Sequence, residues 1–199
     1  QVGEHPRRCT VSDVKLMHDY SLATVPTLYA QLERAFAFLP ATYDCRLHAQ
    51  HLDAIEDFRE TEAMVVYLGD KIEVDIVWGW SSAFVGVRFV ELQIPRVSPR
   101  DHAPFGEPKA RPRVIHLRDL AAVRGHANDP DFLLGDSDQV GGRITTKRFR
   151  LLQSDLAGVL DGLARATERH ASDILRGDLS VYPEVKAYRD EKPWPWGQR

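Results

Sequence analysis

The segment from Ala63 to Leu92 constrains the fold most strongly, because it holds three short runs of strand-forming residues, with apolar–polar alternation clearest in the middle run. The runs are Met64–Leu68, Ile72–Trp78 and Phe84–Leu92, and they are separated by Gly69-Asp70 and by Gly79-Trp80-Ser81-Ser82. A glycine-first pair between two such runs is typical of a two-residue hairpin turn. The alternation therefore predicts an antiparallel β-meander at about residues 63–92, with one shared apolar face.

The same pattern predicts the register of the central pair of strands. Trp78 would lie opposite Val85, Ile76 opposite Val87, and Val74 opposite Phe89. Asp75 would then lie opposite Arg88 on the other face, together with Glu73. A slip of one residue would expose the whole apolar row, so the pattern specifies its own pairing. Val65 and Tyr67 extend the apolar face onto the first strand.

Two amphipathic helices are predicted to cover this face, near residues 26–39 and 154–171. Pro26 suits a first helical turn, and Ser154 is a candidate N-cap. The expected fold is a two-layer α+β sandwich with four or five strands. Additional strands are expected within 46–58 and at 143–151, and additional helices at 117–124 and from 183 to about 190.

The chain of 199 residues is expected to form one α+β domain. Residues 1–16 are given little weight, because they begin without methionine and are interpreted as disordered or foreign to the domain. Residues 93–113 carry five prolines and read as a long basic loop, and residues 192–199 form a Trp/Pro tail. Cys9 and Cys45 form no disulfide framework, and whether they pair is left open. No apolar run of membrane-spanning length and no signal peptide is present, so a cytoplasmic location is expected.

Charge is segregated along the chain. Residues 51–75 hold eight acidic and two basic side chains, and residues 93–118 hold six basic and two acidic ones. One interpretation is that these patches face each other in the fold. The other is a polarised protein with a charged docking face.

His48 and His51 are the best metal-binding candidates in the sequence. On a helix the two imidazoles would share one face and could bind zinc or iron. On a strand, a spacing of three residues sends them to opposite faces and the pair is lost. No second motif supplies a third ligand.

Other catalytic and cofactor signatures are absent from the sequence. There is no glycine-rich phosphate loop, no Gly-x-Ser-x-Gly elbow and no complete calcium loop, and no cofactor is expected. Cys45 follows Asp44, and this acidic neighbour should raise the pKa of the thiol. An enzyme is disfavoured but left open.

A nucleic-acid-binding function is a further alternative. The segment 143–150 supplies basic residues and an aromatic ring suited to phosphate contacts and base stacking: Arg143, Lys147, Arg148, Phe149 and Arg150. The net charge of −3 and the lack of any nucleic-acid-binding motif argue against it.

The order of elements resembles that of small uncharacterised bacterial proteins, including immunity proteins that neutralise a toxin. The resemblance rests on the aromatic stretch Ala35–Leu39, on the meander, and on the segment Asp173–Pro183 after the last long helix. It covers about two thirds of the chain in outline, and the basic loop departs from it. An excess of arginine over lysine, 20 to 6, also fits a GC-rich bacterial genome.

The leading hypothesis is a non-enzymatic protein that acts through a protein partner, as an inhibitor of the immunity type. Carboxylates in the acidic segment would steer a basic partner, and tryptophans of the tail would anchor it. The predicted contacts are Glu56, Asp57, Glu60, Glu62, Trp194 and Trp196. No membrane partner is expected, and self-association is left open.

Overall fold

The computed structural model describes residues 27–53, 62–79, 84–93, 95–98, 113–132 and 146–191. Five strands form one antiparallel sheet in the order β1-β2-β3-β4-β5. The strands are β1 (Arg46–Asp53), β2 (Glu62–Leu68), β3 (Ile72–Gly79), β4 (Phe84–Glu91) and β5 (Val114–His116). The labelled helices are α2 (Phe38–Tyr43), α3 (Leu117–Val123), α4 (Thr146–Leu175) and α5 (Tyr182–Glu191), and residues 27–35 are also helical.

The predicted meander register is confirmed. Trp78 pairs with Val85, Ile76 with Val87, Val74 with Phe89, and Asp75 with Arg88. Val65 and Tyr67 continue the apolar rows on β2, where they pair with Ile76 and Val74. We call this apolar side the helix face and the opposite side the second face.

The β2–β3 turn lies one residue later than predicted. The amide of Gly69 donates to the carbonyl of Ile72, so Asp70 and Lys71 form the two-residue loop. Gly69 itself ends the strand pair, and an added Cβ there would lie 2.9 Å from the Cys45 sulfur. The glycine is therefore explained by the close approach of Cys45 rather than by the turn.

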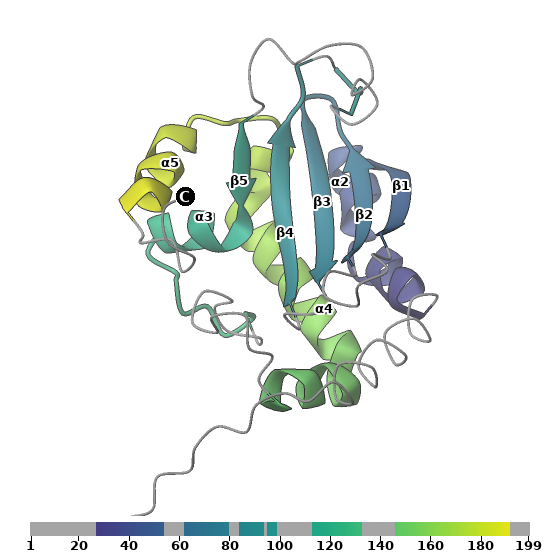
Figure 1. The fold of residues 1–199 in the computed structure, drawn as a ribbon. Helices are drawn as coiled ribbons and strands as arrows, with labels where there is room; N and C mark the ends of the chain where they lie inside the picture. The colour runs from purple at the N-terminus through teal and green to yellow at the C-terminus, as the bar shows by residue number, and fades with distance from the viewer. Residues whose placement is uncertain are drawn as a thin grey trace, which may run out of the picture.

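The structure has the two predicted layers. In Figure 1, α4 crosses behind the sheet, and α2 lies behind β1 and β2. The helix face packs against these helices in one core that contains Ile76, Val87 and Phe89 together with Leu28, Phe36, Leu160 and Ile174. The fold is thus an α+β sandwich, as the sequence predicts.

The helix predicted over residues 26–39 is divided in two. Residues 27–35 are helical, a turn follows at residues 36–37, and α2 begins at Phe38. Pro40 explains the break, because it has no N–H for the Phe36 carbonyl and its ring would crowd that carbonyl in a continuous helix. In the first turn of α2 the proline is tolerated.

Helix α4 is longer than predicted, and from Thr146 onward it replaces the strand expected at 143–151, whose first three residues lie outside the described part of the chain. It runs over 30 residues with a break at Asp155, whose φ and ψ are −149° and 53°. The carboxylate of Asp155 accepts a hydrogen bond from the Gly158 amide at 2.9 Å. Asp155, not Ser154, therefore caps the second half of the helix. The Ser154 hydroxyl instead donates to the Leu151 carbonyl.

The remaining short elements follow the prediction with one addition. A strand within 46–58 and helices at 117–124 and 183–190 are present as β1, α3 and α5. Strand β5 was not predicted, because it directly follows the proline-rich segment and is only three residues long. It pairs with β4 and extends the sheet beyond the meander.

Candidate functional site

The β1–β2 hairpin joins the acidic segment to one edge of the sheet. The register pairs Asp53, the last residue of β1, with Glu62, the first residue of β2. Residues 54–61 connect the two strands, and they include the predicted contacts Glu56, Asp57 and Glu60. These three residues lie outside the described part of the chain, and only the backbone of Glu62 is described. The four acidic residues among the predicted partner contacts thus belong to one hairpin and its connection.

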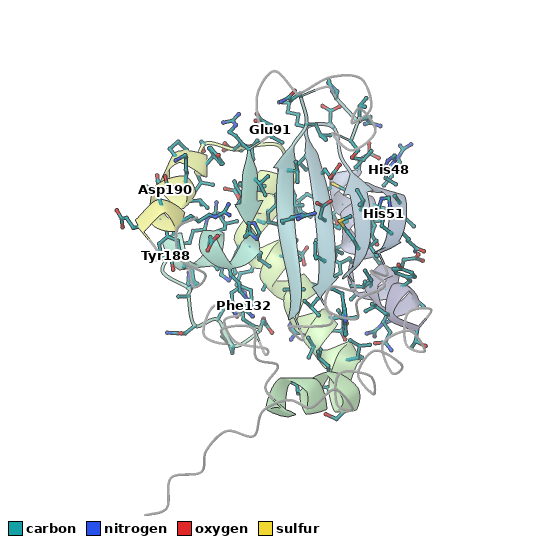
Figure 2. All side chains as sticks on the ribbon, in the orientation of Figure 1. His48, His51, Glu91, Phe132, Tyr188 and Asp190 are labelled. Carbon is teal, nitrogen blue, oxygen red and sulfur yellow. The ribbon has the colours of Figure 1, made fainter. Side chains whose placement is uncertain are left out.

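The outer strand of this hairpin is exposed over most of its length. Arg46, His48, Gln50 and His51 are exposed, and Leu47 is 45% exposed, an unusual value for a large apolar side chain in this fold. The register skips His48, so β1 contains a β-bulge between Leu47 and Ala49. In Figure 2, His48 and His51 lie at the outer side of β1.

Two contacts join this strand to the helix of residues 27–35. The Gln50 amide donates to Glu33 at 2.6 Å, and the Tyr29 hydroxyl donates to the His51 carbonyl at 2.9 Å. These bonds fix β1 against the helix of residues 27–35. The edge of β1 that faces away from β2 has no neighbouring strand among the described residues.

The second face of the sheet carries a buried charged row. Asp75 is fully buried and Glu73 is 1% exposed. Arg88 Nε donates to Asp75 at 2.7 Å, and His116 is the register partner of Arg88 on β5. The sequence placed Glu73 and Asp75 on this face correctly, but its alternation does not reveal that the face is buried.

His116 is the titratable group of this row that the environment alters most clearly. Burial, with smaller contributions from Arg189 and Arg88, lowers the pKa of His116 to about 4. Its imidazole is therefore neutral at pH 7. A neutral imidazole can still donate or accept a hydrogen bond, but His116 does not line the cavity described next.

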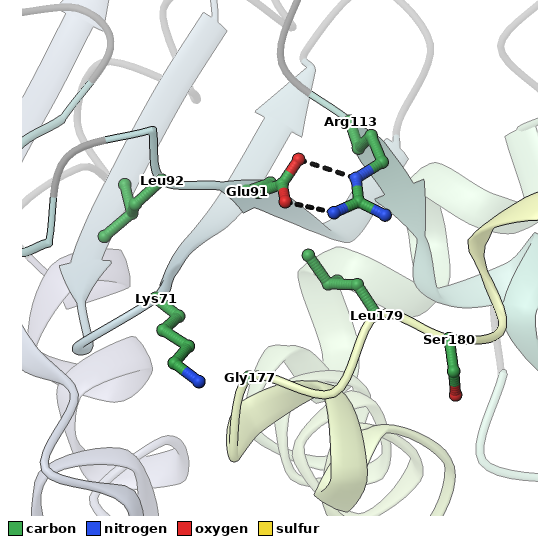
Figure 3. Close-up of a pocket in the computed structure, with 7 residues that line it drawn as sticks. All are labelled: Lys71, Glu91, Leu92, Arg113, Gly177, Leu179 and Ser180. Atoms are coloured by element: carbon green, nitrogen blue, oxygen red, sulfur yellow. Dashed lines mark hydrogen bonds and ion pairs between the residues drawn. The ribbon is translucent and has the colours of Figure 1, made fainter.

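A small cavity lies where β4 ends and β5 begins, beside the segment that joins α4 to α5 (Figure 3). Its volume is about 260 Å³, below the roughly 300–1,000 Å³ typical of small-molecule sites. Seven residues line it: Lys71, Glu91, Leu92, Arg113, Gly177, Leu179 and Ser180. Arg113 forms a two-pronged ion pair with Glu91, and this hydrogen bond is the main reason that the pKa of Glu91 is lowered. The charges on this wall are therefore largely neutralised within the protein.

A third polar cluster joins the loop after α3 to helix α4. His170 is 3% exposed and donates from Nε2 to Asp129 at 2.5 Å, and Arg169 donates to the same carboxylate at 2.6 Å. Burial alone would raise the pKa of Asp129. The hydrogen bonds from His170, the Asp131 amide and Arg169 together outweigh it and lower the pKa to about 2. Asp129 is therefore ionised, and its carboxylate accepts hydrogen bonds from the Asp131 amide, Arg169 and His170.

The same cluster stabilises a break in α4. Ala171 has non-helical φ and ψ of −126° and 17°, directly after His170. Arg124 donates to the His170 carbonyl and forms an ion pair with Asp173 on either side of this break. Asp131 pairs with Arg165 at 2.6 Å and with Arg169 at 2.8 Å. We interpret this cluster as a structural clamp between α3 and α4, because its polar groups are paired with one another.

Sequence reasoning missed this cluster. Its members come from residues 124–131 and 165–173, about 40 positions apart, and no local motif connects them. The one available signal was the spacing of Arg165 and Arg169, which puts two guanidinium groups on one face of a helix.

His48 and His51 are not arranged as the metal hypothesis requires. Both belong to strand β1, so the helix that would bring their imidazoles to one face is not formed. No group of three or more histidine, cysteine, aspartate or glutamate side chains suited to a metal ion occurs among the described residues. A metal site on this pair stays a prediction.

The other predicted sites are only partly described. Lys147, Arg148, Phe149 and Arg150 belong to the first turns of α4, and the description there is limited to the backbone. Arg143, Trp194 and Trp196 lie outside the described residues. For Cys45, burial and, to a smaller extent, Asp44 raise the pKa to about 11, which confirms the expected direction.

The charge segregation is partly internal. Arg96, from the basic loop, forms ion pairs with Asp44 at 2.8 Å and with Asp70 at 3.6 Å. Basic and acidic segments therefore face each other at this point, as the first of the two interpretations expects. No described helix has the length and apolar character needed to cross a bilayer.

Comparisons with protein-family models, with curated proteins and with solved structures found no match for this chain.

Proposed function

We propose that this protein binds a positively charged protein partner through the acidic end of its β1–β2 hairpin and acts as an inhibitor of the immunity type. The observation that carries the proposal is the register of Asp53 opposite Glu62, which makes the acidic residues 53–62 the tip of one hairpin. This tip contains five carboxylates and one guanidinium, a net charge of −4.

The other carboxylates of the acidic segment are used within the protein. Asp75 is paired with Arg88, Asp70 lies 3.6 Å from Arg96, and Glu73 is buried. The negative charge of this segment that remains for a partner is therefore that of the hairpin tip. The predicted contacts Glu56, Asp57, Glu60 and Glu62 belong to this tip, and Trp194 and Trp196 are the candidate apolar anchors in the tail.

A concentrated charge of this kind acts mainly on the rate of association. Complementary charges steer diffusional encounter and can raise association rates from about 10⁵–10⁶ to about 10⁸ M⁻¹s⁻¹ at low salt. The effect is screened within roughly 8–10 Å at physiological ionic strength. A partner that depends on the hairpin tip should therefore bind more slowly as salt is added.

The test compares two variants that lose the same charge. The first, Glu56→Gln/Asp57→Asn/Glu60→Gln, neutralises the tip. The matched control, Glu168→Gln/Glu184→Gln/Glu191→Gln, removes three exposed glutamates of α4 and α5. Each protein is immobilised and exposed to a lysate of the source cells, and retained proteins are identified by mass spectrometry. Association rates of the retained protein are then measured at two salt concentrations.

The expected result is a basic protein retained by the wild type and by the control, with at least about a tenfold lower association rate for the tip variant at low salt. Equal association rates for all three proteins, or no protein retained by the wild type, would contradict the proposal.

A further inference from the structure

Strand β1 is the outer strand of the sheet, and no described strand pairs with its free edge. In Figure 1 it forms the right-hand border of the sheet, beyond β2. It is eight residues long, and its exposed side chains include the apolar Leu47. A long edge of this kind is a template for pairing with another strand.

The bulge at His48 determines which residues of β1 share a face. Leu47, Gln50 and Leu52 pair with Tyr67, Val65 and Ala63, so they belong to the helix face. Arg46, Ala49, His51 and Asp53 pair with Leu68, Val66, Met64 and Glu62 on the second face. In a strand without the bulge, residues 47 and 52 would belong to opposite faces, because they are five positions apart.

This arrangement makes the edge self-complementary. If two copies of β1 pair antiparallel about a twofold axis at Gln50, Ala49 of one copy lies opposite His51 of the other. The register skips His48 in each copy, because His48 is the bulged residue. Leu47 therefore lies opposite Leu52, and Arg46 lies opposite Asp53. Every pair matches in face. Without the bulge the same axis would place Leu47 opposite Asp53 and His48 opposite Leu52.

We propose that the protein forms a homodimer by antiparallel pairing of β1 with β1 of a second copy, which joins two five-stranded sheets into one. The second copy is favoured over an unrelated strand by charge and apolar complementarity at both ends of the pairing. Two Arg46–Asp53 pairs flank two Leu47–Leu52 pairs, and cross-strand pairs of both kinds stabilise a sheet. Parallel pairing would instead bring Arg46 opposite Arg46.

The described contacts of β1 are compatible with this pairing. The Arg46 side chain is 72% exposed. Its ion-pair partner among the described residues is Asp44, at 3.1 Å. The Tyr29 hydroxyl donates to the His51 carbonyl, but a carbonyl oxygen has two lone pairs and can accept a second hydrogen bond. Neither contact has to break when a second strand is added.

The affinity should be modest, because one strand pair buries less than the roughly 1,200–2,000 Å² of a standard stable interface. We expect a dissociation constant between about 1 μM and 1 mM, so analytical sedimentation must span this concentration range. EDTA is included, so that association bridged by a metal ion through His48 and His51 is not counted. This proposal shares Asp53 with the acidic tip proposed above, but it does not use the predicted contacts Glu56, Asp57, Glu60 and Glu62.

The test uses a charge exchange. Arg46→Glu and Asp53→Arg each replace two attractive pairs with two repulsive ones, and each should raise the dimer dissociation constant about tenfold or more. The double variant Arg46→Glu/Asp53→Arg restores opposite charges and should regain the wild-type constant within about threefold. Lys186→Glu on α5 reverses an exposed charge far along the chain from β1 and should not change dimerisation. Thermal melting confirms that each variant is folded.

A second readout locates the interface. Amide hydrogen exchange of residues 46–53 should slow in the wild type as the concentration rises, and exchange in α5 should not change. A wild type that stays monomeric up to about 1 mM would overturn the proposal. So would a dimer that is insensitive to Arg46→Glu, or a folded double variant that fails to regain dimerisation.

Discussion

Arg88 donates from Nε to the carboxylate of Asp75 at 2.7 Å across β3 and β4, and the two side chains differ sharply in exposure: Asp75 is fully buried, whereas Arg88 keeps 29% of its side chain exposed. Arg88 also approaches the sulfur of Met64 at 3.4 Å, so its guanidinium spans three strands. The pair therefore ties the centre of the sheet together on the second face.

Removing one partner of this pair should be costly. We expect Asp75→Ala to lower the free energy of unfolding by about 3–5 kcal/mol, because a largely buried guanidinium is left without its counter-charge. The apolar double variant Asp75→Leu/Arg88→Met should recover most of that loss. Urea denaturation measures both. As a control, Asp44→Asn removes only exposed ion pairs, because asparagine tolerates the left-handed backbone of this position (φ of 51°), and it should have a far smaller effect. Equal losses for Asp75→Ala and Asp44→Asn would contradict this account.

The Asp129–His170 contact predicts an acid-dependent stability. The pKa of Asp129 falls from 3.8 to about 2 on folding, so its contribution is fully present above about pH 4 and is lost as the pH falls through 2. The contribution is on the order of 2 kcal/mol. Asp129→Asn should be less stable at pH 5 and should lose less stability between pH 4 and pH 2. Chemical denaturation at both pH values measures this, and parallel pH profiles of variant and wild type would rule it out.

Two glycines with positive φ allow backbone strain to be separated from crowding. Gly125 and Gly177 have φ of 81° and 83°, and an added Cβ at Gly125 would meet nothing within 4 Å. At Gly177 it would lie 2.9 Å from Lys71 Cδ. Replacing either glycine with alanine should lower the free energy of unfolding by about 1–2 kcal/mol, because a side chain disfavours the left-handed backbone. Gly177→Ala should lower it more than Gly125→Ala. In a Lys71→Ala background the difference between them should shrink, because the contact with Cδ is removed while Lys71 Cβ, 3.0 Å from the added Cβ, remains. An unchanged difference would mean that crowding by the outer part of the Lys71 side chain is not its cause.

The cap within α4 gives a fourth prediction. Asp155→Ala should lower the free energy of unfolding by about 1 kcal/mol, because the Gly158 amide loses its acceptor. Ser154→Ala, one residue earlier, should have a smaller effect, since the Ser154 hydroxyl bonds back to Leu151 within the preceding turn. Thermal and urea unfolding of the two variants decide between Asp155 and Ser154 as the cap, and a larger loss for Ser154→Ala would reverse the assignment.

The meander register was predictable because a strand repeats every two residues, so that Ile76, Val87 and Phe89 could share one interior in only one way. The end of the first helix was not predictable, because Pro40 is compatible with either the end of one helix or the first turn of the next. Strand β5 was missed because its three residues, beside a proline-rich segment, are too few to show the two-residue apolar–polar repeat of a strand. The burial of Asp75 was missed because an alternating pattern says which face a residue occupies, not what covers that face.

The clamp between α3 and α4 was unpredictable for a different reason. Asp129 and His170 are 41 residues apart, and each is unremarkable in its own sequence context. The hairpin that carries the proposed contacts could be located from the sequence, since β1 lies within the expected strand region. Its bulge could not, because the bulge depends on how Leu47 and Ala49 meet β2.

The separation of Asp129 from His170 also bears on how the chain reaches its native state. Strands β1 to β4 pair only with neighbours along the chain, so they can form through short loops at a small entropic cost. The clamp requires closure of a much longer loop, and contacts between distant residues slow folding. We expect the sheet to acquire protection early in refolding, and the helical layer to lock onto it only when the arginines of α4 reach the aspartates beyond α3.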